Sequence, residues 1–233
     1  MAIAVGDIHG CLNPLKKLIA ALPPGEPLVF LGDYIDRGPD SAGVVRYLRG
    51  LAAQRPCRFL KGNHEELMRE ATTDRGSIDL WLINGGEATL PSYGVELSRW
   101  LQEKDRGEFL RADREFYDSL ELFVEDEETI FVHAGIDTSV PDMARQQPEV
   151  LLWVRERFFL NAAAWRGKQI VFGHTPTRSL HLPPGEIIRN HRVFGIDTGC
   201  VYGGHLTAMD MRTHELYQEP SDFSYLARRA QRH

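Results

Sequence analysis

Cysteine is scarce in this sequence and is not arranged for metal or disulfide chemistry. The chain has three cysteines, Cys11, Cys57 and Cys200, which lie far apart and form no C-x-x-C pair. This pattern excludes a zinc ribbon and a disulfide-stapled scaffold, and it fits a reducing compartment. We therefore expect a cytoplasmic protein whose cysteines are small core residues.

Long hydrophobic runs and an excess of basic residues are also absent. No segment approaches the roughly 20 apolar residues that a membrane-spanning helix needs, and no positively charged start precedes an apolar stretch. The 27 basic and 33 acidic residues give a formal net charge of -6, which argues against a nucleic-acid duplex as a partner. No linker or low-complexity tract divides the chain, so we predict a single domain, residues 1–233.

What the sequence does contain is a repeated arrangement in which polar motifs follow short apolar runs. Each run is rich in Val, Ile, Leu or Phe and indicates a buried strand. The motifs are GDIHG at Gly6–Gly10, GDYIDRG at Gly32–Gly38, GNHE at Gly62–Glu65, HAG at His133–Gly135 and GHT at Gly173–Thr175. Ligands bind at the carboxyl ends of strands in open α/β sheets, so we expect these motifs to converge on one crevice.

The order of the predicted elements favours an α/β fold. A strand at 2–5 leads to a helix that Asn13 caps and Pro14 starts, and a strand at 28–31 leads to a helix that Asp40 caps. A strand at 58–60 leads to a helix near Glu65 and to a helical insertion at about 66–120. β-type runs with hairpins follow, at 122–125, 129–132, 169–172, 192–196, 206–209 and 215–217. We predict a β-sandwich of two sheets packed face to face and flanked by helices.

Six side chains of the motifs are candidate ligands for two divalent metal ions. They are Asp7, His9, Asp33, Asn63, His133 and His174. Carboxylate together with imidazole suits manganese, our expected ion, or iron, zinc or cobalt, better than calcium. The carboxylate of Asp33 can bridge two cations, which would then lie roughly 3.5–4 Å apart. Such a pair lowers the pKa of a bridging water and holds a phosphoryl group for in-line attack.

The remaining polar residues of two motifs fit the same reaction. Arg37 lies just past Asp33, and its planar fork can pair with phosphate oxygens. His64, next to Asn63, can protonate a leaving alkoxide as a general acid, and Asp36 can orient it through the other ring nitrogen. The structural alternative for His64 is a packing histidine.

In this order, the five motifs resemble those of the bacterial and phage-type phosphoprotein phosphatases, within the calcineurin-like metallophosphoesterases. The resemblance implies that Asp7 and His9 bind one ion, that Asp33 bridges, and that the Asn63, His133 and His174 side chains bind the other. The segment LWVRER at Leu152–Arg157 resembles one in which the first arginine contacts phosphate, which makes Arg155 a second phosphate ligand. The alternative for Arg155 is an ion pair at the surface. Residues 82–94 and 195–208 are similar to the helical insertion and the closing strands of bacterial relatives.

The substrate is left open between two enzyme classes. Symmetrical dinucleoside tetraphosphate hydrolases share the scaffold but typically carry G-D-I-Q-G and depart from D-R-G, whereas this chain has His9 and an intact Asp36-Arg37. This difference favours a serine/threonine phosphatase-like phosphomonoesterase that acts on a phosphorylated protein or a small phosphoester. The alternative is a dinucleoside polyphosphate (Ap4A-type) or other nucleotide pyrophosphate hydrolase. Outside enzymes, the alternative is a silent phosphate- or partner-binding module.

Other residues receive weaker interpretations. Asp197 ends an apolar run, so it could approach the site behind the ligands, but it is interpreted as a strand-end cap. The aromatic Trp81 is interpreted as core. Tyr93 and Trp153 could line a substrate pocket. The chain lacks the longer C-terminal region that forms regulatory-subunit grooves in eukaryotic relatives, so we expect no regulatory subunit.

Overall fold

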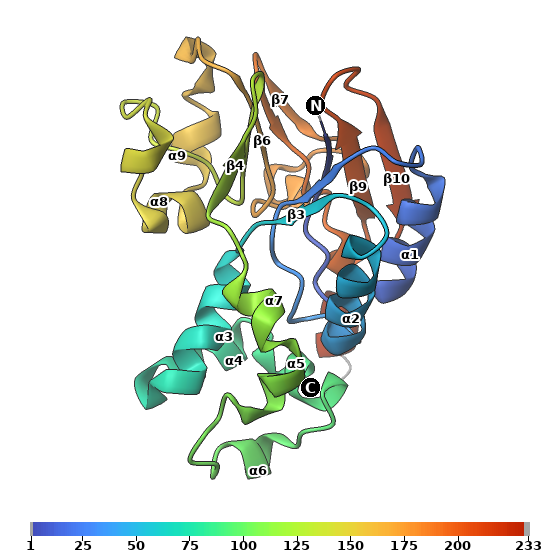
Figure 1. The fold of residues 1–233 in the computed structure, drawn as a ribbon, viewed down its shortest axis with the longest axis vertical. Coiled ribbons are helices and arrows are strands. Elements are labelled where there is room, and N and C mark those ends of the chain that lie inside the picture. The colour runs from blue at the N-terminus through green and yellow to red at the C-terminus, as the bar shows by residue number, and fades with distance from the viewer. Residues whose placement is uncertain (1, 231–233) are drawn as a thin grey trace.

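The computed structural model describes residues 2–230 and contains two five-stranded sheets packed face to face (Figure 1). The strands are β1 (Ile3–Val5), β2 (Leu28–Phe30), β3 (Cys57–Phe59), β4 (Phe123–Glu125), β5 (Thr129–Val132), β6 (Gln169–Phe172), β7 (Ile188–Asn190), β8 (Val193–Gly195), β9 (His205–Asp210) and β10 (Leu216–Pro220). The α-helices are α1 (Leu12–Ala21), α2 (Ser41–Ala52), α3 (Asn63–Thr73), α4 (Ile78–Ile83), α5 (Thr89–Ser92), α6 (Leu97–Trp100), α7 (Arg114–Asp118), α8 (Pro148–Trp153), α9 (Glu156–Phe159) and α10 (Tyr225–Ala230).

Each sheet combines three parallel strands with antiparallel strands. The first has the order β10-β9-β1-β2-β3, in which β1, β2 and β3 are parallel. The second has the order β4-β5-β6-β8-β7, in which β5, β6 and β8 are parallel. The pairs β4-β5 and β9-β10 are antiparallel, which confirms the predicted hairpins and the α/β sandwich. The pair β7-β8 is antiparallel as well.

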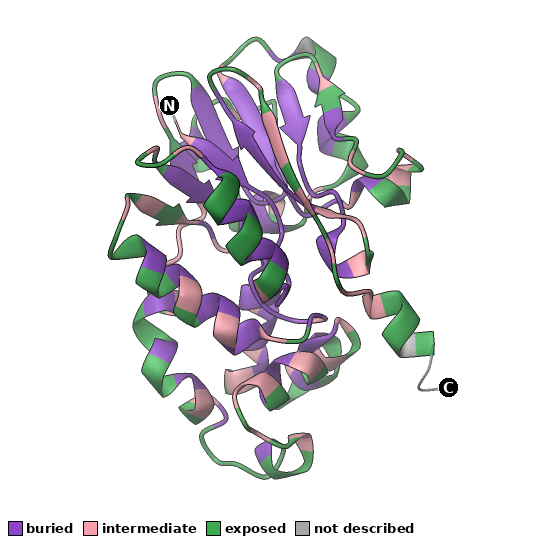
Figure 2. Cartoon of the chain, turned by 90° about the vertical axis from the view of Figure 1, so that its right-hand side faces the viewer, coloured by how far each residue is buried: buried purple, intermediate pink, exposed green. Residues whose placement is uncertain are grey.

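The alternation of side chains along the strands builds the layers. In β1, Ala4 faces the second sheet and packs in one cluster with Val171 and Phe131, whereas Ile3 and Val5 belong to a cluster with residues of α1 and α2. This is the two-residue period of a strand that is buried on both faces. In Figure 2 the strands are mostly buried, while the helices also present exposed residues to solvent.

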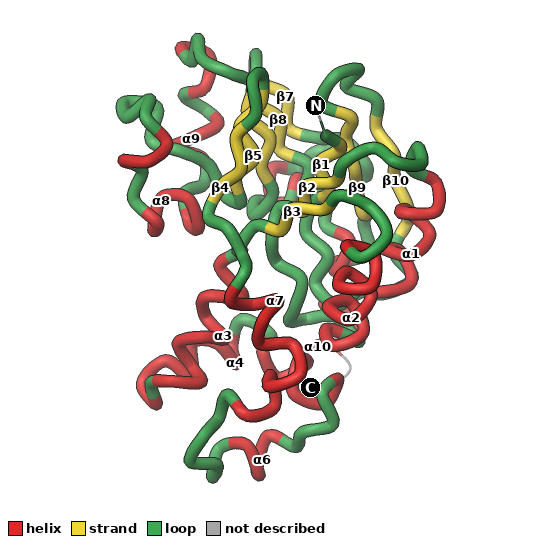
Figure 3. Tube along the Cα trace, in the orientation of Figure 1, coloured by secondary structure: helices red, strands yellow, loops and turns green. Residues whose placement is uncertain are grey.

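Helices α3 to α7 form the predicted helical insertion. They lie below the two sheets in Figure 1, and Figure 3 shows helix and loop in this part of the molecule, with the strands above it. The rings of Trp81 and Trp100 are fully buried there and contact each other edge to face, with centroids 5.3 Å apart. Burial of aromatic side chains of this size accounts for the packing of the short helices, which are too short to be stable alone.

Two predicted helix starts each lie two residues too late. Helix α1 begins at Leu12, with Cys11 in the N-cap position, so Asn13 is not the cap and Pro14 lies in the first turn. Proline is tolerated there because N–H groups of the first turn have no partner within the helix. Helix α3 begins at Asn63 instead of near Glu65. The predicted cap of α2 is confirmed, since the Asp40 side chain accepts a hydrogen bond from the Gly43 N–H group.

The sequence analysis missed four elements, β7, α8, α9 and α10. All are short, at three to six residues, and their patterns are too brief to establish a period. Within residues 2–230, no helix combines the length and the apolar character needed to cross a bilayer.

Candidate metal centre

The loops that follow the parallel strands of both sheets bring all six predicted metal ligands into one buried region. Asp7 and His9 follow β1, Asp33 follows β2, and Asn63 opens α3 after β3. From the second sheet, His133 follows β5 and His174 follows β6. None of the six side chains is more than 4 % exposed. Side chains so polar are found this deeply buried where they are paired or hold an ion.

The backbone of these loops is strained where it presents the polar side chains. Five residues of the region lie in the left-handed conformation: His9 (φ 45°), Asp33 (φ 53°), Asp36 (φ 71°), Arg37 (φ 67°) and His174 (φ 64°). Such residues cost on the order of 1–3 kcal/mol each and cluster at functional sites.

Glycine is required where two loops touch. A Cβ atom on Gly62 would overlap Oδ1 of Asp33, and one on Gly173 would overlap Oδ1 of Asp7. The motif glycines therefore allow the backbone to approach the carboxylates directly.

Asp33 lies between two groups of histidines. Its Oδ2 atom is 3.4 Å from Nε2 of His9 and 4.0 Å from Nε2 of His64. Its Oδ1 atom is 3.6 Å from Nε2 of His133 on the other side. One carboxylate thus faces two separate sets of nitrogen donors, which is the arrangement that a bridging ligand requires.

The hydrogen bonds of His9 determine which of its nitrogens can bind a cation. Nδ1 lies 2.8 Å from the carbonyl oxygen of Ile35, which can only accept, so Nδ1 carries the proton and Nε2 presents a lone pair. Burial, and then the Arg37 charge, lower the pKa of His9 well below its ordinary value. The imidazole is therefore neutral, as metal ligation requires.

Hydrogen bonds also determine which atoms of the second group, His133, Asn63 and His174, can bind a cation. Nδ1 of His133 donates to the carbonyl oxygen of Leu31 at 2.8 Å, and burial lowers its pKa to about 4. Its Nε2 lone pair faces Oδ1 of Asn63 at 3.0 Å, and Nδ1 of His174 lies 2.8 Å from the same oxygen. The lone pairs of His133 Nε2 and Asn63 Oδ1 repel each other unless a cation lies between them.

Asp7 lies apart from these two groups. The ligand atoms of His9, Asp33 and His64 all lie within 4.8 Å of one another, as do those of Asp33, His133 and His174, and Asp7 is in neither set. Its Oδ2 accepts a hydrogen bond from the backbone N–H of His174 at 2.9 Å. Its Oδ1 is buried with no hydrogen-bond partner in the described part of the chain. Burial, and then the charges of Asp197 and Asp33, raise the pKa of Asp7 well above its usual range.

The residues present fit divalent metal ions. Each of these residues offers a lone pair to a cation. The donors are the unprotonated Nε2 atoms of His9 and His133, the oxygens of Asp33 and the unpartnered oxygen of Asp7. Mixed carboxylate, amide and imidazole donors are those of a site for manganese, iron, zinc or cobalt.

Asp197 is closer to this region than its interpretation as a strand-end cap implied. It is buried, it accepts a hydrogen bond from the backbone of Gly199, and burial raises its pKa to about 6. The charge of Asp33 raises this pKa further, which places two carboxylates in one electrostatic environment. The apolar run before Asp197 was the only sequence signal for it.

Glu65 was given no role in the sequence analysis, although it belongs to the GNHE motif. Its carboxylate accepts hydrogen bonds from the backbone N–H groups of Asp33 at 3.0 Å, Tyr34 at 2.9 Å and Gly62 at 2.9 Å. It therefore ties the loop after β2 to the start of α3, and so holds Asp33 next to Asn63.

His64 and Asp36 contact each other as predicted, and the contact has further partners. Nδ1 of His64 lies 2.8 Å from Oδ2 of Asp36. The same carboxylate accepts hydrogen bonds from Nε1 of Trp81 at 2.9 Å and from Oγ1 of Thr89 at 2.6 Å. Trp81 is thus a core residue that also donates a hydrogen bond to Asp36. Burial raises the pKa of Asp36, and the Thr89 and Trp81 hydrogen bonds oppose this.

The two predicted phosphate ligands lie at the edge of the same region. Nη1 of Arg37 donates to Nε2 of His9 at 2.8 Å, which is the nitrogen that would face a cation, so Arg37 would turn away from it when an ion is bound. Nη1 of Arg155 donates to the carbonyl oxygen of His174 at 3.2 Å. In the described chain Arg155 has no carboxylate partner, so the alternative of an ion pair at the surface is not what the structure contains. The half-exposed Trp153 packs edge to face on His174, with centroids 6.2 Å apart.

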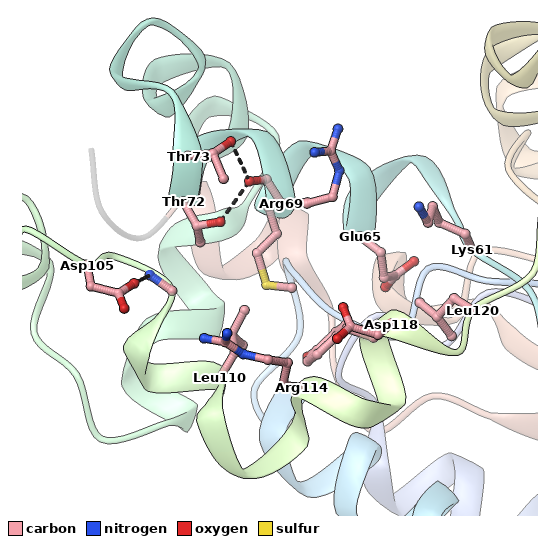
Figure 4. Close-up of a pocket in the computed structure, with 13 residues that line it drawn as sticks. Lys61, Glu65, Arg69, Thr72, Thr73, Asp105, Leu110, Arg114, Asp118 and Leu120 are labelled. Carbon is pink, nitrogen blue, oxygen red and sulfur yellow. Dashed lines mark hydrogen bonds between the residues drawn. The ribbon is translucent and has the colours of Figure 1, made fainter.

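A cavity of about 370 Å³ lies elsewhere, between α3 and α7 (Figure 4). It is lined by Met68, Leu110, Arg114 and others, and none of the predicted metal or phosphate ligands lines it. Glu65, which also lines it, is the link between this cavity and the loops of the metal centre.

The chain belongs to a known family of hydrolases. A sequence model of the calcineurin-like phosphoesterases matches residues 2–209, which is most of the chain. The fold and the arrangement of Asp and His residues agree with this match, so the chain is a metallophosphoesterase of the calcineurin-like family.

Its relatives within that family differ in activity. The chain is 30% identical over 245 residues to the asymmetrical bis(5'-nucleosyl)-tetraphosphatase PrpE of Halalkalibacterium halodurans, covering 93% of this chain and 92% of the relative. It is 32% identical over 208 residues to serine/threonine-protein phosphatase 1 of Salmonella typhimurium, covering 87% and 88%. A solved structure provisionally named a diadenosine tetraphosphatase has the same fold, with a TM-score of 0.65, 24% identity and coverage of 94% and 93%.

Proposed function

We propose that this protein hydrolyses phosphomonoesters, in the manner of a serine/threonine protein phosphatase, with two divalent metal ions. The observation that carries the proposal is the position of Asp33, whose Oδ2 faces His9 at 3.4 Å and whose Oδ1 faces His133 at 3.6 Å. Asp7 and His9 would complete the shell of one ion, and Asn63, His133 and His174 that of the other. When bound, the ions supply a hydroxide near neutral pH and bind phosphoryl oxygens.

The side chains at the rim position the phosphate in this account. Arg37 and Arg155 carry guanidinium groups that can form paired hydrogen bonds to its oxygens. Both lie next to proposed metal ligands, Arg37 at the side chain of His9 and Arg155 at the backbone of His174. The phosphate is thereby held where its phosphorus can be attacked.

His64 and Asp36 favour an alcohol as the leaving group. Asp36 accepts the Nδ1 proton of His64, and in the imidazolium form Nε2 carries a second proton that it can give to the departing oxygen. Burial, and then the Arg37 charge, lower the pKa of His64 well below its ordinary value, so this imidazolium is a strong proton donor. A serine or threonine alkoxide is a poor leaving group and needs this proton, whereas a phosphate that leaves from an anhydride needs it much less. The dyad therefore supports phosphomonoester hydrolysis.

A second candidate, asymmetrical hydrolysis of dinucleoside tetraphosphates, is supported by the comparisons. The tetraphosphatase of Halalkalibacterium halodurans matches this chain over nearly the whole length of both proteins. The phosphatase of Salmonella typhimurium has similar identity over a slightly smaller share. The sequence relationship therefore supports the two substrates about equally.

A comparison of three substrates tests these functions. Metal-stripped protein reloaded with Mn²⁺ would be assayed with p-nitrophenyl phosphate, a phosphothreonine peptide and diadenosine tetraphosphate. A higher kcat/KM for the phosphopeptide than for the dinucleotide supports the main proposal, and the reverse order supports the second candidate. Absence of all three activities in protein with two bound ions would contradict both and favour a binding module.

A further inference from the structure

An aromatic ring links Arg37 to a second arginine that has no role in the account above. The guanidinium carbons of Arg37 and Arg178 lie 5.6 Å and 5.4 Å from the centroid of the Tyr202 ring. Tyr202 lies in the loop before β9, and Arg178 lies in the turn that follows the GHT motif. Two segments that border the metal centre therefore place a second cation beside the first.

The position of Arg178 is set by the loop beneath it. Its Nη1 donates to the carbonyl oxygen of Tyr202 at 3.4 Å. The aliphatic part of the Arg178 side chain packs against Gly199. A Cβ atom at this glycine would lie 3.7 Å from Cδ of Arg178. The guanidinium is thus held by backbone and ring contacts, and most of its N–H groups stay available to a ligand.

Arg178 has no acidic partner in the described chain, whereas the charge of Arg37 acts on the buried carboxylates of the metal centre and opposes the rise that burial causes in the pKa of Asp33 and of Asp197. Within residues 2–230, neither Arg37 nor Arg178 forms an ion pair with an acidic side chain, and Arg178 is exposed. By contrast, exposed arginines such as Arg58, Arg69 and Arg99 pair with glutamates. The unpaired charge of Arg178 therefore favours an anion beside it.

We propose that Arg178, acting with Arg37 across the Tyr202 ring, binds the phosphate next to the one that is attacked, so that the site accepts an oligophosphate chain. The proposal rests on the proposed two-metal site, because it takes the attacked phosphate to lie at the ions, and of the two candidate functions it favours the second, the hydrolysis of dinucleoside tetraphosphates. Arg37 reaches the metal centre through His9, whereas Arg178 contacts it only through Tyr202. Arg178 is thus the outer of the two cations, separated from the metal centre by one more contact than Arg37. Arg178 is a specificity-determining residue in this account.

The test compares the binding of pyrophosphate and orthophosphate. Calorimetry would measure both dissociation constants on Mn²⁺-loaded protein, with equal free Mn²⁺ in cell and syringe, for wild type, Arg178→Gln and Arg189→Gln. Arg189 is a matched control, because it is also exposed and lies over an aromatic ring, 5.8 Å from the centroid of Phe194, on the edge strand β7.

We expect Arg178→Gln to weaken pyrophosphate about tenfold, which corresponds to about 1.4 kcal/mol, and to change orthophosphate less than about twofold. Arg189→Gln should bind both anions like wild type. Equal effects of Arg178→Gln on both anions, or an effect on neither, would overturn the proposal. Hydrolysis of p-nitrophenyl phosphate would be measured on the same samples. Its absence would contradict the proposed function, whereas the ratio of the pyrophosphate and orthophosphate dissociation constants would still test the role of Arg178.

Discussion

The imidazole of His64 is tied to the carboxylate of Asp36, with Nδ1 of the first 2.8 Å from Oδ2 of the second. Both side chains are almost completely buried. The carboxylate is in turn held by Trp81 and Thr89 of the helical insertion. The insertion thus sets the orientation of the proposed general acid, and it is more than a covering for the sheets.

Replacement of His64 by alanine should slow the enzyme in a way that depends on the leaving group. We expect kcat to fall by about 10²–10⁴ on a phosphothreonine peptide, whose alkoxide needs a proton. On p-nitrophenyl phosphate the fall should be much smaller, because the phenolate leaves readily without one. Steady-state kinetics on both substrates checks this, and equal losses would contradict the assignment of His64 as the acid.

Replacement of Trp81 by phenylalanine should separate positioning from packing. A smaller aromatic ring replaces the indole and the N–H donor to Asp36 is lost, which should cost about 1–3 kcal/mol of unfolding free energy and lower kcat on the phosphopeptide. Trp100→Phe is the matched control, since its N–H donates to the carbonyl of Arg106 in the same cluster. We expect a similar loss of stability but an unchanged kcat. If the two variants lowered kcat alike, Trp81 would have only a packing role.

Replacement of Glu65 by glutamine should destabilise both the fold and the metal centre. The carboxylate accepts three backbone N–H groups, whereas the amide has one acceptor oxygen and turns its NH₂ group toward a donor. We expect a loss of about 1–3 kcal/mol in urea unfolding and weaker Mn²⁺ binding by calorimetry. Glu66→Gln, which only loses ion pairs with Lys61 and Arg69 near the surface, should cost about 1 kcal/mol or less. Similar effects of both changes would contradict this role of Glu65.

Mn²⁺ should stabilise the protein more at pH 7.5 than at pH 5. Burial raises the pKa of Asp33 to about 6, so the metal-free folded protein keeps a proton there below that pH, and an ion must displace it. The pKa of His133 is lowered to about 4, so this imidazole has no proton to lose at pH 5. The stabilisation is therefore present above pH 6 and declines below it. Thermal unfolding with and without Mn²⁺ at the two pH values is the measurement, and an equal shift in Tm at both would refute the prediction.

The sequence allowed the convergence of the six candidate ligands to be predicted because each follows a strand directly. Once strand ends meet at one edge of each sheet, Asp33 and His133 must come close although 100 residues separate them. The contacts of Asp36 with Trp81 and Thr89 could not be predicted in this way. They depend on how short helices pack, and Trp81 has the same local pattern as Trp100, which does not contact Asp36.

Glu65 was missed for a different reason. A glutamate three residues into a helix is common as a partner of the N-cap N–H group, and Glu65 does accept from Gly62. Nothing in its local sequence indicates that the same carboxylate also accepts from Asp33 and Tyr34, about 30 residues earlier. These two hydrogen bonds form because β2 and β3 are adjacent and parallel, so the loop after β2 lies next to the start of α3. Asp197 accepts from the nearby Gly199 N–H group as a strand-end cap would, whereas its electrostatic contact with Asp33 involves a residue that is remote in sequence.

The bridging role of Asp33 is the central claim, and the number of metal ions bound per chain tests it most directly. Elemental analysis of Mn²⁺-loaded, desalted protein should give two ions per chain for wild type. Asp33→Asn keeps the size of the side chain but removes the charge that both ions share, so it should lose most of both ions, whereas His9→Asn and His174→Asn should each retain one. A single ion in the wild type, or two ions in Asp33→Asn, would contradict the account.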